Sequence, residues 1–335
     1  MSSHIHFRLA VYVPIKPEHH DLFICTPGET AMSCPIDISR RKMLLASGIG
    51  LAALSTSSLA RTLGGSPNAS LSSGGLYLPN SPAEGVLTSD AVRQRAYAMP
   101  LISPAYAQPP SWFLDRPSLT ISYRTDIEAA RAMVPEPLVV KDPIVSLSFL
   151  WMVAPGIGDY YEFAQSISCF LGDEAVSYRP LMVAENMTAI MLGREVWGLP
   201  KKFGHPHIGA NNESYVGTLE YDGSLVARAS MAYKFKAVDL AEATKSMQVP
   251  GVVLKIIPDV DGKTPRIAEL VRFEYSTVEL KEAWTGAASL ELFDHEAVPV
   301  SALPVREIVS VRHTLGNFEL APGKVVHDYL NPNKP

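Results

Sequence analysis

The stretch GREVWGLPKKFG, residues 193–204, carries the strongest signal in this sequence. Two adjacent lysines, Lys201 and Lys202, follow Pro200 and stand among apolar residues and glycines. Burial among apolar side chains disfavours the charged form of a lysine and lowers its pKa from about 10.4. The free amine could then attack a ketone and form an imine, which accepts an electron pair when a neighbouring carboxylate leaves. A lysine pair alone is usually solvent-exposed, so the pattern by itself leaves a surface position open.

Outward from this stretch, the pattern between about residues 99 and 330 is mostly one of strands. The predicted strands are 145–152, 215–221, 225–233, 253–257, 270–280, 288–293 and 318–329. Asp222 and Gly223, between two of them, are typical of a tight hairpin. Helices are predicted only at 126–133, with Thr125 as the capping residue, and at 240–247. We therefore predict an α+β protein that is mostly antiparallel β, built on a barrel-like sheet.

The amino-terminal part of the chain has a different character. Arg40 and Arg41 directly precede an apolar stretch, residues 43–54, which is too short to span a membrane. A possible cleavage point follows at Ala60, so the three parts of an export signal of the twin-arginine type occur in order. An amphipathic helix or a disordered tail is the alternative. Because signals begin close to the amino terminus, Met32 is a better start than the first residue.

These patterns divide the chain into three parts. Residues 1–62 are read as an amino-terminal extension with an export signal. Residues 63–98, rich in Ser, Gly, Pro and Asn, are read as a disordered linker, and residues 99–331 as the folded domain. The expected location is therefore periplasmic or otherwise exported, with the cytoplasm as the alternative. No membrane association is expected of the mature form.

Composition excludes several classes of function. The net charge of −5 implies no basic face, so nucleic acid is not an expected partner. The three cysteines, Cys25, Cys34 and Cys169, lack the spacing of a zinc site or a disulfide framework. Cys169 is expected to be a small buried residue. No GxGxxG, GxxxxGK[ST] or HExxH motif occurs, and we expect no cofactor and no metal.

Many collinear segments between Met99 and Leu330 resemble the acetoacetate decarboxylase family. They include MPLISPAY (99–106), YRTD (123–126), VPEPL (134–138), GDYYE (158–162), GREVWGLPKK (193–202), GTLEYDG (217–223) and LKIIPDVDGKTPRIAEL (254–270). The resemblance implies the family's cone or barrel of strands with a few short helices, and a homo-oligomer. It also implies a cofactor-free carboxy-lyase that uses a lysine Schiff base to convert acetoacetate, or a related 3-oxo acid, to a ketone and carbon dioxide.

The resemblance also assigns roles to individual residues. The Schiff-base lysine falls on Lys201, and the arginine that would hold the substrate carboxylate by paired hydrogen bonds falls on Arg116. Glu162 is expected to orient groups or to relay a proton. Lys202 stays among the candidate catalytic residues, although in an extended segment its side chain would face away from the pocket. For Arg116, a surface ion pair with Asp115 or another nearby acid is the alternative.

Two positions depart from the family's pattern, and both are predicted to contact the substrate together with Arg116. Ser148 stands where the family has a second glutamate, and Phe163 stands where it has a small polar residue. Phe163 is expected to reshape the pocket. Ser148 keeps a second function open, an imine-forming aldolase or dehydratase acting on pyruvate-like keto acids. A non-catalytic protein that binds a small carbonyl compound is a third alternative.

Overall fold

A computed structural model describes residues 87–331 of this protein. The expected export signal and most of the expected linker lie outside these residues. The last part of the predicted linker contains a helix, α1 (Ser89–Arg95), whose first turn is capped by the Thr88 hydroxyl. No helix in the described part of the chain is both long and apolar enough to cross a bilayer.

Most of the described chain is strand. The strands are β1 (Ser111–Arg124), β2 (Ile144–Ala154), β3 (Gly158–Leu171), β4 (Glu174–Ala184), β5 (Lys201–Phe203), β6 (His205–Asn211), β7 (Ser214–Tyr221), β8 (Ser224–Ala232), β9 (Lys236–Ala237), β10 (Gly251–Pro258), β11 (Pro265–Phe273), β12 (Tyr275–Thr285), β13 (Ala288–Leu292), β14 (Glu307–Leu320) and β15 (Lys324–Asp328). The helices besides α1 are α2 (Ile127–Met133), α3 (Met187–Leu192), a π-helix η2 (Gly193–Trp197), α4 (Leu240–Met247) and a 3₁₀ turn η3 (Val300–Ala302).

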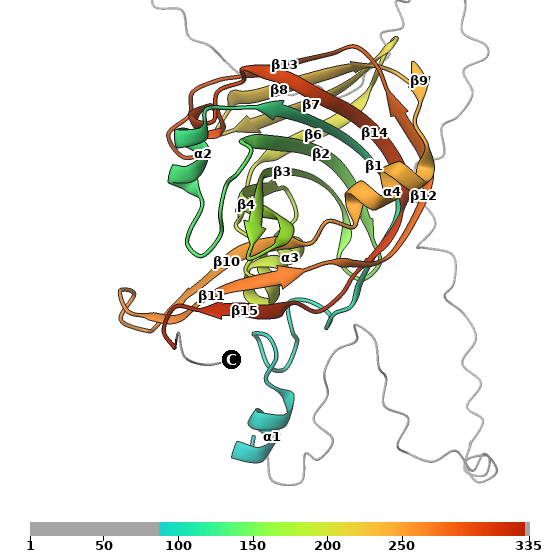
Figure 1. Ribbon diagram of the computed structural model, residues 1–335. Coiled ribbons are helices and arrows are strands. Elements are labelled where there is room, and N and C mark those ends of the chain that lie inside the picture. Colours follow the sequence, from blue (N-terminus) through green and yellow to red (C-terminus); the bar gives the residue numbers. More distant parts are fainter. Residues whose placement is uncertain (1–86, 332–335) are drawn as a thin grey trace, which may run out of the picture. The chain divides into compact units, whose positions relative to one another are not determined.

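The strands form two sheets. The larger has the order β15-β11-β10-β4-β3-β2-β1-β14-β12-β9, with β5 paired to β4 beside this path. Only the pairs of β4 with β10 and with β5 are parallel among the described strands. The sheet curves around α3 but its two end strands do not pair, so the expected barrel does not close (Figure 1). The smaller sheet, β13-β8-β7-β6, packs against the larger one. The prediction of a mostly antiparallel α+β fold is confirmed.

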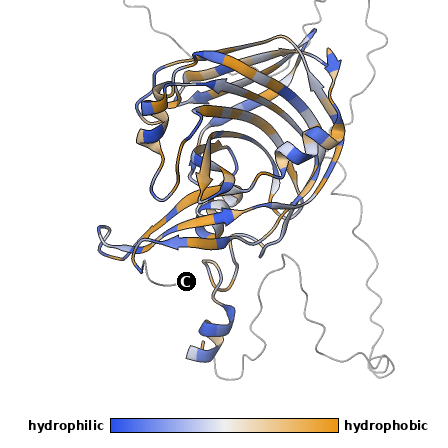
Figure 2. Cartoon of the chain, viewed as in Figure 1, coloured by the Kyte–Doolittle hydropathy of each residue, from blue (hydrophilic) through white to orange (hydrophobic). Residues whose placement is uncertain are grey.

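The two faces of the large sheet have different chemistry, because successive side chains along a strand point to opposite faces. One face carries large apolar side chains, including Leu119, Ile121, Leu147, Phe149 and Phe163, that are buried in a single core cluster. The other face carries hydroxyl side chains at the alternate positions, including Ser118, Thr120, Ser146 and Ser148. Colouring by hydropathy shows apolar and polar residues mixed along the same strands (Figure 2). One face therefore packs the core while the other lines a cavity.

Two predicted strands are wrong in extent. The predicted strand 270–280 is two strands, β11 and β12, which separate at Glu274. The chain changes partner there: Phe273 pairs with β10, whereas Tyr275 pairs with the end of β14. The predicted strand 318–329 is likewise the end of β14, a turn at residues 321–323, and β15. Alternation of apolar and polar residues continues across Glu274, so it could not reveal the change of partner there. Pro322 and Gly323 do mark the second break.

Other local predictions are confirmed or corrected in detail. The hairpin joins β7 to β8, with Asp222 and Gly223 at φ values of 47° and 76°. Helix α4 has the predicted bounds. The cap of α2 is Asp126 rather than Thr125, whose hydroxyl is buried and has no hydrogen-bond partner among the described residues. Cys169 is buried in the core, as expected.

Candidate functional site

A buried ion pair lies at the centre of the site. The Nζ of Lys201 lies 2.6 Å from Oε2 of Glu162, and the two side chains are 6% and 5% exposed. Apart from the amine of Lys201, this oxygen has no polar partner among the described residues. The structure thus brings two of the predicted site residues together from β5 and β3. Lys201 is therefore not the solvent-exposed surface lysine that the sequence pattern alone allowed.

The backbone before Lys201 fixes where its amine points. The π-helix η2 ends at Gly198, whose φ of 82° is left-handed and turns the chain toward β5. Gly193 leaves room for the lysine stem, because a Cβ there would lie 3.0 Å from both Cδ and Cε of Lys201. Arg194 donates to the carbonyl of Lys201 at 3.2 Å. Gly193 therefore makes room for the Lys201 side chain, whereas Gly198 makes room for Lys255, whose Cβ would lie 2.3 Å from an added Cβ.

Lys202 does not share this environment. Its Nζ donates to the carbonyl of Ala297 at 2.5 Å, and the residue is exposed. Because β5 is extended, the side chains of Lys201 and Lys202 leave opposite faces of the strand. The structure therefore places the second lysine outside the ion-pair site, where it contacts a loop carbonyl.

Phe163 also lies away from the site, which corrects the expected substrate contact. It follows Glu162 on β3, so its ring points to the opposite face of the large sheet. There it is fully buried in the core and packs edge-on against Phe149, with ring centroids 5.2 Å apart. Phe163 supports the strand that carries Glu162 and does not reach the pocket.

Arg116 is a buried cation without a carboxylate partner. It follows an irregularity in β1 between Phe113 and Arg116, and its guanidinium carbon lies 4.5 Å from the centroid of the Phe318 ring. No ion pair or hydrogen bond connects its guanidinium to any described residue, and its Nε is buried without a partner. Burial lowers the pKa of Arg116, against the opposing effect of Tyr275 and Glu162. The alternative surface pair does not form, since Asp115 contacts Lys281 instead.

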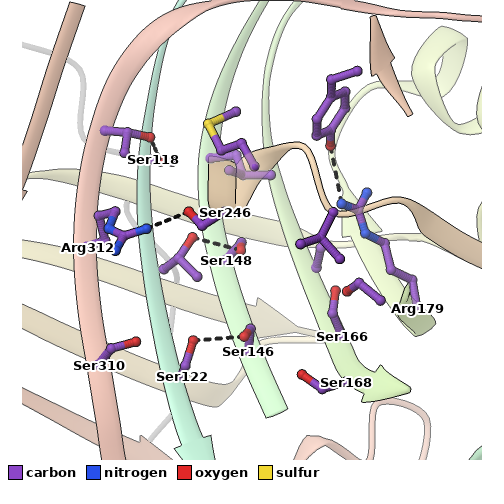
Figure 3. Close-up of a pocket in the computed structure, with 18 of the residues that line it drawn as sticks. Ser118, Ser122, Ser146, Ser148, Ser166, Ser168, Arg179, Ser246, Ser310 and Arg312 are labelled. Carbon is purple, nitrogen blue, oxygen red and sulfur yellow. Dashed lines mark hydrogen bonds between the residues drawn. The ribbon is translucent and has the colours of Figure 1, made fainter. Parts of the chain in front are cut away.

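Ser148 lies in the cavity on the inner face of the large sheet. Its hydroxyl is 2.9 Å from that of Thr120 on the neighbouring strand. The cavity has a volume of about 380 Å³, and hydroxyl side chains from five strands of the sheet, β1, β2, β3, β4 and β14, dominate its lining. Figure 3 shows them in rows, with Arg179 and Arg312 on opposite sides of the space. The prediction that Ser148 contacts substrate stays a prediction, but its hydroxyl is open to this cavity.

Arg116 connects the cavity to the ion pair. It lines the cavity, whereas Lys201 and Glu162 do not. Glu162 nevertheless shares the inner face of β3 with Ala164, two residues along the strand, and Ala164 does line the cavity. The ion pair therefore stands at the closed side of a polar space that a small acid could occupy.

Three residues of the site were not predicted from the sequence. Tyr160 places its ring centroid 5.5 Å from the Nζ of Lys201. The hydroxyl of Tyr275 accepts a hydrogen bond from Arg179 at 3.2 Å. Burial alone would raise the pKa of Tyr275, but Arg179 and Arg116 together lower it below its usual value. Tyr160 belongs to the GDYYE stretch, one of the segments that resemble the family, so the sequence pointed to it. Arg179 and Tyr275 lie in stretches whose residue pattern predicts strand and nothing more.

Comparison with known proteins agrees with this geometry. Acetoacetate decarboxylase 1 of Mesorhizobium japonicum is 47% identical over 242 residues, which cover 72% of this chain and 98% of that protein. A solved acetoacetate decarboxylase structure is 40% identical, with a TM-score of 0.70, and covers 72% of this chain and 99% of the other. That of Legionella pneumophila is 34% identical, with a TM-score of 0.67, covering 71% and 96%.

The family model for acetoacetate decarboxylase matches residues 98–330, which include the buried lysine, the glutamate that pairs with it and the buried arginine beside them. A match of this length, together with the shared arrangement of strands, means that this chain belongs to the acetoacetate decarboxylase family.

Proposed function

We propose that this protein is a carboxy-lyase that converts acetoacetate, or a closely related 3-oxo acid, to a ketone and carbon dioxide through an imine on Lys201. The observation that carries the proposal is the buried contact between Lys201 and Glu162 beside an unpaired buried arginine. Relatives that match this chain over nearly their whole length bear the name acetoacetate decarboxylase.

In this proposal Lys201 performs the covalent chemistry. Its proton passes to the neighbouring Glu162, and the free amine adds to the ketone carbon with loss of water to give a protonated imine. The bond between the carboxylate and the α-carbon then breaks, and its electron pair moves into the imine. Carbon dioxide leaves, a proton adds to the α-carbon, and water hydrolyses the new imine to release the ketone.

The neighbouring charged groups divide the remaining work. Glu162, held 2.6 Å from the amine, is placed to take the proton and to return one to the α-carbon. Arg116 offers its free guanidinium to the substrate carboxylate before that group is lost. Both side chains are buried, and electrostatic interactions are stronger in such surroundings than in solution.

Ser148 supports a second candidate function, an imine-forming aldolase or dehydratase that acts on pyruvate-like keto acids. It contributes a neutral hydroxyl to the cavity, already paired with Thr120, and therefore supplies no second acid near the lysine. An imine that keeps its carboxylate could instead lose a proton from the neighbouring carbon, and the resulting enamine could add to the carbonyl carbon of an aldehyde.

Release of carbon dioxide and acetone from acetoacetate distinguishes the two functions. The wild type and Lys201→Ala are compared, with borohydride trapping and intact mass as a second readout. Acetone release that disappears in Lys201→Ala, with a trapped adduct only in the wild type, supports the decarboxylase. A trapped adduct without carbon dioxide would exclude acetoacetate decarboxylation and favour the aldolase-like alternative.

We also propose that the protein is exported through its twin-arginine-like signal and assembles as a homo-oligomer. Fusion of residues 32–98 to a reporter that is active only after export tests the first point. Replacement of both arginines in that fusion should abolish the reporter signal. The mass of the purified protein in solution, measured by light scattering, tests the second point, and a monomer would contradict it.

A further inference from the structure

The cavity beside the reactive pair has the chemistry of an anion site. Three arginines, Arg116, Arg179 and Arg312, line it together with many serine and threonine hydroxyls. No aspartate or glutamate is among the described residues that line it. Arg312 is already neutralised, because it contacts Glu242 at 3.0 Å. Arg116 and Arg179 form no ion pair with a carboxylate among the described residues.

Arg179 is held in place but its charge is not balanced. Its terminal nitrogen donates to the Tyr275 hydroxyl at 3.2 Å, and its guanidinium carbon lies 4.7 Å from the centroid of the Phe273 ring. No carboxylate pairs with it among the described residues, and its Nε is buried without a hydrogen-bond partner. A buried guanidinium with free donors is stabilised by an anion that binds to it.

The charges of the site leave an excess of positive groups. Among the described residues, Glu162 is the carboxylate that pairs with the amine of Lys201. Arg179 donates to the Tyr275 hydroxyl, and Arg179 and Arg116 together lower the pKa of Tyr275 against the opposing effect of its burial. A substrate with a single carboxylate would neutralise only one of the two arginines.

The cavity is also larger than a four-carbon keto acid requires. At about 30 Å³ for each water molecule, its volume of about 380 Å³ would hold about a dozen solvent molecules. Hydroxyl side chains rather than apolar ones continue along the sheet from Ser118 and Ser148 to Ser122 and Ser146 (Figure 3). Such a lining suits a polar chain extension better than an alkyl one.

We infer that Arg179 forms a second anion-binding subsite, so that the preferred substrates are 3-oxo acids that carry a second carboxylate. This inference rests on the proposed decarboxylase function. Arg116 would hold the carboxylate that leaves and Arg179 the one that stays. With 3-oxoadipate, the bond from the leaving carboxylate to the α-carbon breaks into the imine of Lys201. A proton replaces the carbon dioxide, and water releases 4-oxopentanoate.

Two substrates of equal length isolate the contribution of the second carboxylate. 3-Oxoadipate and 3-oxohexanoate differ only in whether the far end is a carboxylate or a methyl group. Carbon dioxide release is measured for both, with an enzyme-free blank subtracted for spontaneous loss. We expect kcat/KM of the wild type to be about 10- to 100-fold higher for 3-oxoadipate, the effect of one hydrogen-bonded charge pair.

Three variants assign that preference to Arg179. Arg179→Gln should reduce the ratio of the two kcat/KM values by at least about tenfold, whereas Arg179→Lys should retain part of it because the charge remains. Arg266→Gln is the matched control, since Arg266 is an exposed arginine that pairs with Asp259 away from the cavity. It should leave both substrates unchanged. A wild type that prefers 3-oxohexanoate, or an Arg179→Gln variant that lowers both values equally, would overturn the inference.

A binding measurement keeps this test separate from the test of catalysis. Calorimetric titration of the full chain compares adipate with hexanoate, neither of which can be decarboxylated by this route. Tighter binding of adipate that is lost in Arg179→Gln supports the subsite even if no carbon dioxide is released from any substrate. Equal binding of the two acids would overturn the subsite even if acetoacetate is turned over.

Discussion

Replacement of Gly193 by alanine should move the reactive lysine without unfolding the protein. The added Cβ would lie 3.0 Å from Cδ and from Cε of Lys201, and 3.4 Å from Cβ of Leu199. Carbon atoms are in optimal contact at about 3.5–4.0 Å, so the lysine stem must shift by about 0.5 Å. A misplacement of about 1 Å in an active site can lower the rate about 100-fold, and half of that displacement predicts about tenfold.

The expected effect falls on activity rather than on stability. Gly193 has helical dihedral angles, and alanine is favoured over glycine in a helix by about 1 kcal/mol. The assay is kcat/KM for carbon dioxide release, together with the rate of borohydride trapping and the thermal midpoint from circular dichroism. We expect trapping and turnover to fall together, because imine formation itself requires the displaced amine.

Gly223→Ala is the control, in which stability and not turnover is expected to change. Gly223 has a φ of 76° and no atom within 4 Å of an added Cβ, in a hairpin far along the chain from the lysine. Alanine there should reduce stability by about 1 kcal/mol through backbone strain and leave turnover unchanged. If Gly193→Ala keeps full activity, the lysine stem is not positioned by this contact, and the structural reason given for the glycine is wrong.

Four further predictions follow from the contacts of single side chains. Glu162→Gln should lower kcat by about 10²- to 10⁴-fold, because the group that exchanges protons is lost. It should lower the free energy of unfolding by about 3–5 kcal/mol, because the charge of Lys201 is left buried and unpaired. Initial rates measure the first effect and urea titration the second. Lys202→Ala should keep kcat/KM within about threefold, since an exposed polar contact contributes little; a loss beyond tenfold would return this lysine to the site. Phe163→Ala should reduce stability by about 3–5 kcal/mol through a core cavity, with KM nearly unchanged in protein that remains folded. The ring Nδ1 of His313 donates to the buried carbonyl of Ser118 at 2.8 Å, and burial lowers the pKa of His313 below the usual 6.5. Below about pH 6.5 His313 binds a proton in the unfolded chain but stays neutral in the folded chain. The contribution of the neutral, buried His313 to the free energy of unfolding is therefore present above about pH 6.5 and is lost as the pH falls. His313→Gln should flatten this slope in urea midpoints between pH 7 and 5.

The strands and the central lysine could be predicted because their signals are local. A short apolar run bounded by Pro143 and Pro155 marks β2, alternation marks β7, and two turn residues mark the hairpin after β7. The lysine was found because Pro200 and the surrounding glycines make its setting unusual, and the resemblance then assigned its role. The π-helix at residues 193–197 was not predicted, since no residue pattern distinguishes a single wide turn from irregular structure.

The error at Phe163 has a different origin. Alternation along an extended segment separates Lys201 from Lys202, and it separates Glu162 from Phe163 in the same way. Placing Glu162 in the site already places Phe163 on the opposite face, in the core. The sequence therefore contained enough to assign this residue to packing rather than to the pocket.

Arg179 and Tyr275 could not have been found in this way. They belong to β4 and β12, strands that are far apart in the chain and are not neighbours in the sheet. A disturbance in the pairing of β3 with β4, where Gln165 and Ile167 are opposite Leu181 and Tyr178, falls at Arg179. Irregularities of this kind redirect side chains. Pro180, which cannot donate to the ladder, marks the position of this one but does not assign Arg179 to the site.

The charge balance of the site links the reaction to its substrate. Glu162 neutralises Lys201, so neither group alone attracts or repels an incoming acid strongly. Attraction then comes from Arg116 and Arg179, and a carboxylate at Ser148 would have opposed it. Once the leaving carboxylate has become neutral carbon dioxide, Arg116 no longer holds it. A second carboxylate at Arg179 would still hold the enamine while the proton is added. Ser148, in place of the family's second glutamate, therefore fits a pocket that selects substrates with a second negative charge.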